Sequence, residues 1–178
     1  MNGAETATGT AAAVDIMNQL AGLAPESPVV AVRALRPPVV NHTQGSYDTL
    51  LAPQNASGLT LVERAQVALR VAVLTDSPTL IDHYRQRLVA LGAASESIAA
   101  LAQKDKAVVL DQRTTAIMHH VDLLTHTPGA ATPAALATLQ ERGLRGPEIV
   151  TLSQLIAFLS FQVRVLPVLS LLAEEEAA

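Results

Sequence analysis

No cysteine occurs among the 178 residues of the chain. This absence excludes disulfides, thiolate metal sites and thiol redox chemistry together, although it does not by itself fix the compartment. Aromatic residues are also scarce, at 2% of the chain, whereas hydrophobic residues as a whole make up 49%. The interior must therefore be built mainly from Ala, Leu, Val and Ile, a composition that favours helix packed on helix.

Positive charge is scarce as well. The chain carries 12 Lys plus Arg against 16 Asp plus Glu, a formal net charge of -4, and it has no basic run. Because a nucleic-acid binder needs a clustered positive surface, we expect no nucleic-acid partner. The first residues, Met1 to Glu5, lack the positive region of a secretory signal and lead into an Ala/Thr-rich stretch. We therefore expect a cytoplasmic protein that is long enough to bury a core of its own.

Proline and glycine divide the chain into helical segments. Short helices are predicted over 10–23, 29–35 and 39–51, separated by Pro25, Pro28 and the pair Pro37-Pro38. We interpret residues 1–58 as an N-terminal helical arm or lid. Residues 59–178 then form a helical core within one compact domain, with helices predicted over 60–75, 76–91, 95–103, 107–125, 132–142 and 149–172.

Two of these helices carry specific signals at their ends. Thr60 precedes Glu63 by three residues, which is the spacing of a capping box. The run Asp76-Ser77-Pro78 restarts a helix, because Asp or Ser can accept the free amide bonds and Pro suits the first helical position. Asp76 is well placed as this N-cap, and Gly92 suits the left-handed residue that closes the helix.

The last helix is long enough to cross a bilayer, so a membrane span has to be weighed against a soluble helix. Gln154, Gln162, Arg164 and Pro167 fall inside it. An arginine near the bilayer centre costs roughly 2.5 to 3.5 kcal/mol on an insertion scale, so we expect no membrane partner. The polar groups either line a cavity or bond across a subunit contact, and we expect a core helix or an oligomer interface.

Five segments between residues 59 and 164 follow one another in a specific order and at specific spacings. They are 59–65 (LTLVERA) with the apolar helix to Leu74, then Asp82-His83-Tyr84-Arg85, 113–128, 143–150 (GLRGPEIV) and 158–164 (FLSFQVR). Together they cover about 59–172, and they resemble the carboxymuconolactone decarboxylase and AhpD-like alkylhydroperoxidase superfamily, the later segments resembling its peroxidase-related branch. The resemblance implies an all-α, AhpD-like helical bundle that forms a homo-oligomer, trimer or hexamer, with a pocket near subunit contacts and no organic cofactor.

The sequence departs from that family at its reactive centre. The resemblance implies a C-x-x-C pair four residues before a histidine, and counting back from His83 places Asp76 and Thr79 where the two cysteines stand. Neither residue can form a disulfide or a sulfenic acid. The upstream glutamate of the family corresponds to Arg64, with Glu63 one residue away. We therefore expect no thiol peroxidase activity.

His83, Glu63 and Asp76 are the candidate catalytic residues. Asp76, Thr79 and His83 share one helical face if the helix begins at Asp76, so Asp76 or Glu63 could hold the imidazole while His83 acts as a general base. The substrate would be a small organic acid, a lactone or a peroxide-derived compound. The alternative is a non-catalytic oligomeric binding or structural protein, in which His83 is a satisfied, partly buried histidine.

Two further polar clusters have simpler interpretations. His119, Asp122 and His126 recur at the spacing of a two-His, one-carboxylate site, but spacing alone is weak and we assign no metal. On the first core helix, Glu63, Gln66 and Arg70 form a polar stripe. We predict that this stripe is a solvated face or a salt-bridging subunit surface, with a role in a pocket as the alternative.

Overall fold

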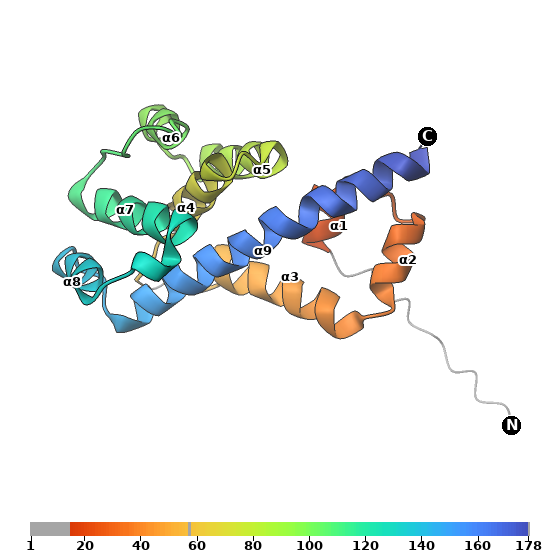
Figure 1. The fold of residues 1–178 in the computed structure, drawn as a ribbon, viewed down its shortest axis with the longest axis horizontal. Coiled ribbons are helices and arrows are strands. Elements are labelled where there is room, and N and C mark those ends of the chain that lie inside the picture. Colours follow the sequence, from red (N-terminus) through yellow and green to blue (C-terminus); the bar gives the residue numbers. More distant parts are fainter. Residues whose placement is uncertain (1–14, 57, 178) are drawn as a thin grey trace, which may run out of the picture.

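The computed structural model describes residues 15–56 and 58–177, and within them the chain folds into helices without a strand (Figure 1). Residues 1–14, which include the start of the helix predicted over 10–23, lie outside the described part. The α-helices in chain order are α1 (Ile16–Leu20), α2 (Pro28–Ala34), α3 (Pro37–Leu51), α4 (Leu61–Leu74), α5 (Pro78–Ala90), α6 (Ser95–Leu101), α7 (Gln112–His126), α8 (Pro133–Glu141) and α9 (Gly146–Ala177). A 3-10 turn, η1 (Pro128–Ala130), follows α7.

Helix starts follow local capping chemistry. The predicted capping box is confirmed: the Glu63 amide donates to Thr60 Oγ1 at 3.1 Å, and the Thr60 amide donates to Glu63 Oε2 at 2.8 Å. α7 starts later than predicted because the Asp111 side chain accepts amide bonds from Arg113 and Thr114. The pair Pro37-Pro38 opens α3 instead of preceding it, since the first helical turn does not need the amide protons that proline lacks.

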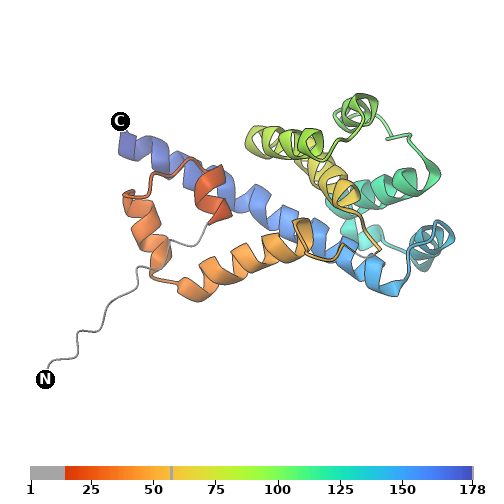
Figure 2. The ribbon, with the colours of Figure 1, turned by 180° about the vertical axis from the view of Figure 1, so that it is seen from behind.

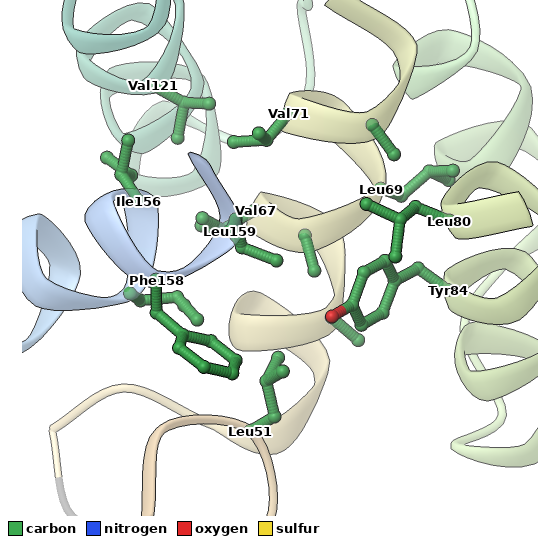
Figure 3. Close-up of a cluster of buried hydrophobic side chains, with 14 of the residues drawn as sticks. Leu51, Val67, Leu69, Val71, Leu80, Tyr84, Val121, Ile156, Phe158 and Leu159 are labelled. Carbon is green, nitrogen blue, oxygen red and sulfur yellow. The ribbon is translucent and has the colours of Figure 1, made fainter. Parts of the chain in front are cut away.

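Helix α4 is the centre of the fold, because every residue from Glu63 to Leu74 is buried. Its apolar side chains pack against α5, α7 and α9, as Figure 3 shows for Val67 and Val71 beside Val121 and Leu159. α4 to α8 gather around the N-terminal half of α9 in Figures 1 and 2, whereas α1 and α2 lie along its C-terminal half. α3 runs beside α9 and contacts α4 near its own end. The arm residues thus pack on the core helices.

The predicted solvent exposure of the polar stripe on α4 is wrong. Glu63, Gln66 and Arg70 have exposed fractions of 8%, 7% and 1%. Arg70 explains how a charge can lie so deep: it donates to both Asp122 carboxylate oxygens, at 2.7 and 2.9 Å, and to the carbonyl oxygens of Gln103 and Lys106. A buried guanidinium needs this many acceptors, and Arg70 uses them to fix the α6–α7 connection onto α4.

Helix α9 has two different sides. Over Gly146–Glu175 it is long and apolar enough to cross a membrane by length and composition, and 39% of its most apolar 18-residue window is buried inside the chain. Leu152, Leu155 and Leu159 on the inner side are fully buried. Val150, Val168 and Leu171 are more than half exposed. The helix therefore completes the core with one side and leaves apolar side chains open on the other.

Candidate functional site

His83 lies on α5 at the junction with α3. Its Nε2 atom and the Tyr47 hydroxyl oxygen are 2.9 Å apart, and its ring meets the Tyr84 ring edge-on with centroids 4.9 Å apart. Burial, together with the charge of Arg87, lowers the pKa of His83 below its usual 6.5. The ring is therefore neutral at pH 7, and its Nε2 atom shares one hydrogen bond with the Tyr47 hydroxyl group. The His83 side chain is thus partly buried and hydrogen-bonded, and its role in or outside catalysis stays a prediction.

Two arginines close the C-terminal end of α3 beside this pair. Arg87 Nη2 donates to the Leu51 carbonyl oxygen at 2.6 Å, and Arg64 Nη1 donates to the Leu50 carbonyl oxygen at 2.7 Å. Cationic side chains are favourable at a helix C-terminus, where carbonyl groups lack partners and the helix dipole is negative. Arg64, which stands where the resemblance places a glutamate, therefore anchors the arm to the core.

Tyr84 continues the cluster into α9. It is fully buried, and its hydroxyl donates to Gln162 Oε1 at 2.6 Å. Burial raises the pKa of Tyr84 well above 10, so the phenol stays protonated at neutral pH. Gln162 was expected to line a cavity or to bond across a subunit contact. The structure instead gives it a buried partner inside its own chain.

Glu63, the first candidate partner for His83, is engaged on another side of α4. One oxygen completes the capping box with Thr60, and the other accepts from Arg113 Nε at 2.6 Å. Arg113 also donates to the Gly58 carbonyl oxygen at 2.6 Å. The structure does not pair Glu63 with His83, since both of its oxygens serve this local network among the described residues.

Asp76, the second candidate partner, is wrongly predicted as the N-cap of α5. Ser77 takes the N-cap position, and Asp76 precedes it in a left-handed conformation with φ of 51°. The Asp76 carboxylate pairs with Lys104 at the surface, where 75% of the Asp76 side chain is exposed. Asp76 and Thr79 line a cavity of about 330 Å³ between the start of α5 and Pro167 of α9.

The residues of α7 that have the spacing of a metal site, His119, Asp122 and His126, do not form such a site among the described residues. Asp122 is bound by Arg70, and His119 is exposed at the edge of a different cavity, of about 370 Å³. In the described part of the chain, no three His, Asp or Glu side chains are grouped closely enough to hold a metal ion. The Asp122 carboxylate, which the spacing indicated as a candidate ligand, is the counter-ion of Arg70.

The larger open space lies between α3 and α9. A cavity of about 660 Å³ is lined there by His42, Ser46, Gln154 and Phe158, among others. His83 lines neither this cavity nor the one beside Asp76. Neither of these two cavities brings the His83 imidazole together with a carboxylate.

Sequence reasoning missed Tyr47 as the partner of His83 and Arg113 as the partner of Glu63. Each pair joins residues on different helices, so no local spacing could indicate it. The effect of the Arg87 charge on the His83 pKa was also missed, although Arg87 follows His83 by four residues on the same side of α5.

Comparison with solved structures identifies the fold. The chain is similar to an uncharacterized peroxidase-related protein from a Silicibacter species, with a TM-score of 0.69 and 18% identity over 86% of this chain and 78% of that one. It is also similar to an uncharacterized peroxidase-related protein with an alkylhydroperoxidase AhpD core from Ralstonia eutropha, with a TM-score of 0.68 and 16% identity over the same shares. No protein-family profile and no curated protein matches the chain. The all-α, AhpD-like fold expected from the resemblance is confirmed, on a chain without cysteine.

Proposed function

We propose that this protein is a non-catalytic, oligomeric binding or structural protein built on the AhpD-like scaffold. The observation that carries the proposal is the engagement of His83. Its imidazole bonds to Tyr47 on α3, next to the two arginines that close the same helix. His83 then holds the arm against the core and does not serve a substrate.

The remaining candidate residues support this proposal. Asp76 and Thr79 supply no sulfur for a peroxide cycle. The carboxylates that could activate His83 are neutralised by other partners, Glu63 by Arg113 and Asp76 by Lys104. A general base needs its orienting group within hydrogen-bond reach, so the constellation for acid/base catalysis is incomplete.

A paired assay tests the proposal. Consumption of an organic hydroperoxide, with and without added thiol, should stay at background in the wild type and in His83→Ala. The same substitution should lower the free energy of unfolding by about 1 kcal/mol, because the Tyr47 hydroxyl loses its partner in a partly buried position. Gln86→Ala is the matched control, since Gln86 is exposed on the same helix and should change neither quantity. Robust thiol-dependent turnover by the wild type would contradict the proposal.

A second candidate function, an acid/base enzyme acting on a small organic acid or lactone, has one observation in its favour. The lowered pKa of His83 keeps the imidazole neutral, and Tyr47 offers a hydroxyl through which a proton could pass. Glu63 or Asp76 would have to approach His83 when substrate binds. If lactone hydrolysis is detected, equal turnover by the wild type and His83→Ala excludes His83 as its base.

A further inference from the structure

A continuous groove runs along the contact between α3 and α9. The cavity of about 660 Å³ described above shares His42 and Phe158 with a second cavity, of about 390 Å³, at the start of α3. It shares Thr49 and Gln154 with a third cavity, of about 300 Å³, at the end of α3. Because neighbouring cavities have lining residues in common, the three form one space, which we call the α3–α9 groove.

The groove is elongated. Since α3 and α9 run in opposite directions (Figure 1), the start of α3 lies beside Phe161 and its end lies beside Glu148. The stretch of α9 between these two residues is about 20 Å long. Small residues such as Gly45 and Ala157 line the middle of the groove. The polar side chains there are exposed and can keep their water when a ligand is bound; they are His42, Thr49 and Gln154.

One end of the groove is apolar. It is lined by Pro38, Val39, Phe158 and Phe161, among others, and the two phenylalanine rings stack with their centroids 6.2 Å apart. These are the only two phenylalanines of the chain. Val39 is 55% exposed and Phe161 is 38% exposed, so both leave apolar surface open to water. Covering that surface would favour the binding of an apolar ligand.

The other end of the groove holds a buried cation without a counter-ion. Arg64 is 4% exposed and lines the groove there. Its Nε and Nη1 atoms donate to the carbonyl oxygens of Leu59 and Leu50, whereas its Nη2 atom has no acceptor among the described residues. No carboxylate in that part of the chain forms an ion pair with Arg64, and the neighbouring Glu63 is paired with Arg113.

The other charged residues at this end do not cancel the charge of Arg64. Arg145 and Glu148 also line the groove here, but they pair with each other, so they add no net charge. A buried guanidinium without a counter-ion is costly, and an anion that reaches it gains a charge-assisted hydrogen bond. The groove therefore favours a negative charge at the Arg64 end and an apolar group at the Phe161 end.

We propose that the α3–α9 groove binds one long-chain fatty acid, with its carboxylate at Arg64 and its hydrocarbon chain against Phe158 and Phe161. The proposal rests on the proposed function and deepens it, because it names the ligand class of a scaffold that binds without reacting. A single negative charge at the head of an apolar chain about 20 Å long matches the two ends of the groove and their separation. His83 lines none of the three cavities, so the bound fatty acid is not a substrate of His83.

Isothermal titration calorimetry with fatty acids, below the concentrations at which they form micelles, tests the proposal. One laurate should bind per chain. Decanoate should bind at least about tenfold more tightly than the uncharged decanol, because the alcohol cannot pair with the guanidinium. Each methylene group removed in the series laurate, decanoate and octanoate should weaken binding by about two- to fourfold, since the groove covers the chain only in part.

Variants test the two ends and the middle of the groove. Arg64→Met should remove the preference for decanoate over decanol, and Arg64→Lys should keep part of it. Ala157→Trp fills the middle of the groove and should weaken laurate binding at least about tenfold, with the helix content unchanged. Ala137→Trp, at an exposed position of α8, is the matched control and should bind laurate like the wild type.

Fluorescence can locate the bound chain, because the protein has no tryptophan of its own. Phe161→Trp places a single indole at the apolar end, and laurate should shift its emission to shorter wavelengths as the ring loses water. Val89→Trp, at a position 65% exposed on α5, is the control and should show no shift.

Equal affinity of the wild type for decanoate and decanol would overturn the proposal, even if Arg64→Met fails to fold. So would laurate binding that Ala157→Trp leaves unchanged, equal emission shifts in Phe161→Trp and Val89→Trp, or binding to phosphatidylglycerol vesicles without binding to monomeric laurate. The absence of saturable laurate binding in a protein that also lacks hydroperoxide turnover would overturn the fatty-acid site alone. Thiol-dependent turnover in a protein that binds laurate as described would contradict the proposed function alone.

Discussion

The pair formed by Arg70 and Asp122 can be tested by removing either residue and then both. The Arg70 side chain is only 2% exposed and that of Asp122 is 27% exposed. Asp122→Ala therefore leaves a buried cation without its counter-ion, whereas Arg70→Met leaves a carboxylate that water can reach. We predict that losing the carboxylate is more damaging than losing the guanidinium.

The magnitudes follow from what each group keeps. Breaking a buried ion pair by removing one partner costs roughly 3 to 5 kcal/mol. Asp122→Ala should lower the free energy of unfolding by about 3 kcal/mol, at the low end of this range, because Arg70 still donates to the carbonyl oxygens of Gln103 and Lys106. Arg70→Met loses charge-assisted hydrogen bonds worth about 1.5 to 3 kcal/mol, but it leaves no buried charge behind, because the Asp122 side chain is 27% exposed. The double variant removes both charges, so it should be about as stable as Arg70→Met.

Urea unfolding followed by far-UV circular dichroism measures these differences in the free energy of unfolding. Thermal unfolding is a second measurement, in which a loss of about 3 kcal/mol lowers Tm by about 6 to 12 °C for a domain of this size. Asp82→Ala, which breaks the exposed pair with Arg85, is the control and should change stability by less than about 1 kcal/mol. Additive costs in the double variant would refute the coupling. A loss of wild-type stability on adding a chelator would instead support a metal at Asp122.

Three further substitutions test single sites. His120 is 4% exposed, and neither ring nitrogen has a hydrogen-bond partner among the described residues, so His120→Leu should stabilise the fold by about 1 to 3 kcal/mol. Burial lowers the pKa of His120 below 6.5, so the wild type should lose stability as pH falls from about 6.5. Urea unfolding measured between about pH 5 and 8 should show a smaller loss in His120→Leu than in the wild type. A destabilised variant whose stability depends on pH as steeply as that of the wild type would contradict this. Gly58→Ala should cost about 1 to 3 kcal/mol or more, because Gly58 has φ of +82° and a Cβ there would lie 2.1 Å from Glu148 Oε1. Gly45→Ala, with open space around its Cβ position inside α3, should instead stabilise by about 0.5 to 1 kcal/mol, and equal effects at the two glycines would refute the steric explanation.

Helix positions were predictable from the sequence where a short-range signal sets them. The Thr60–Glu63 box and the left-handed Gly92 both act within a few residues, and both are confirmed. The error at Asp76 has a local origin as well. Asp76 and Ser77 are both good caps, and the left-handed backbone of Asp76 decided in favour of Ser77.

The candidate site was predictable only in part. His83 could be singled out because the resemblance marks its position, but its partner Tyr47 is 36 residues away on another helix. Glu63 already had a local role as a capping residue, and nothing in the spacing indicated that Arg113 would take its second oxygen. The polar stripe of Glu63, Gln66 and Arg70 was predicted to be solvated, because charged side chains usually lie at the surface. It is buried in the structure, because Asp122 and backbone carbonyl groups supply acceptors for Arg70.

The sequence by itself determined the helical class of the fold and the absence of thiol chemistry. Both depend on composition and on periodicity, which act along the chain. Only the tertiary structure decided what the polar residues do, because a side chain's partner depends on which helices pack together. It made His83 a contact between α3 and α5, made Asp122 the counter-ion of Arg70, and left apolar side chains of α9 such as Val150 and Leu171 exposed.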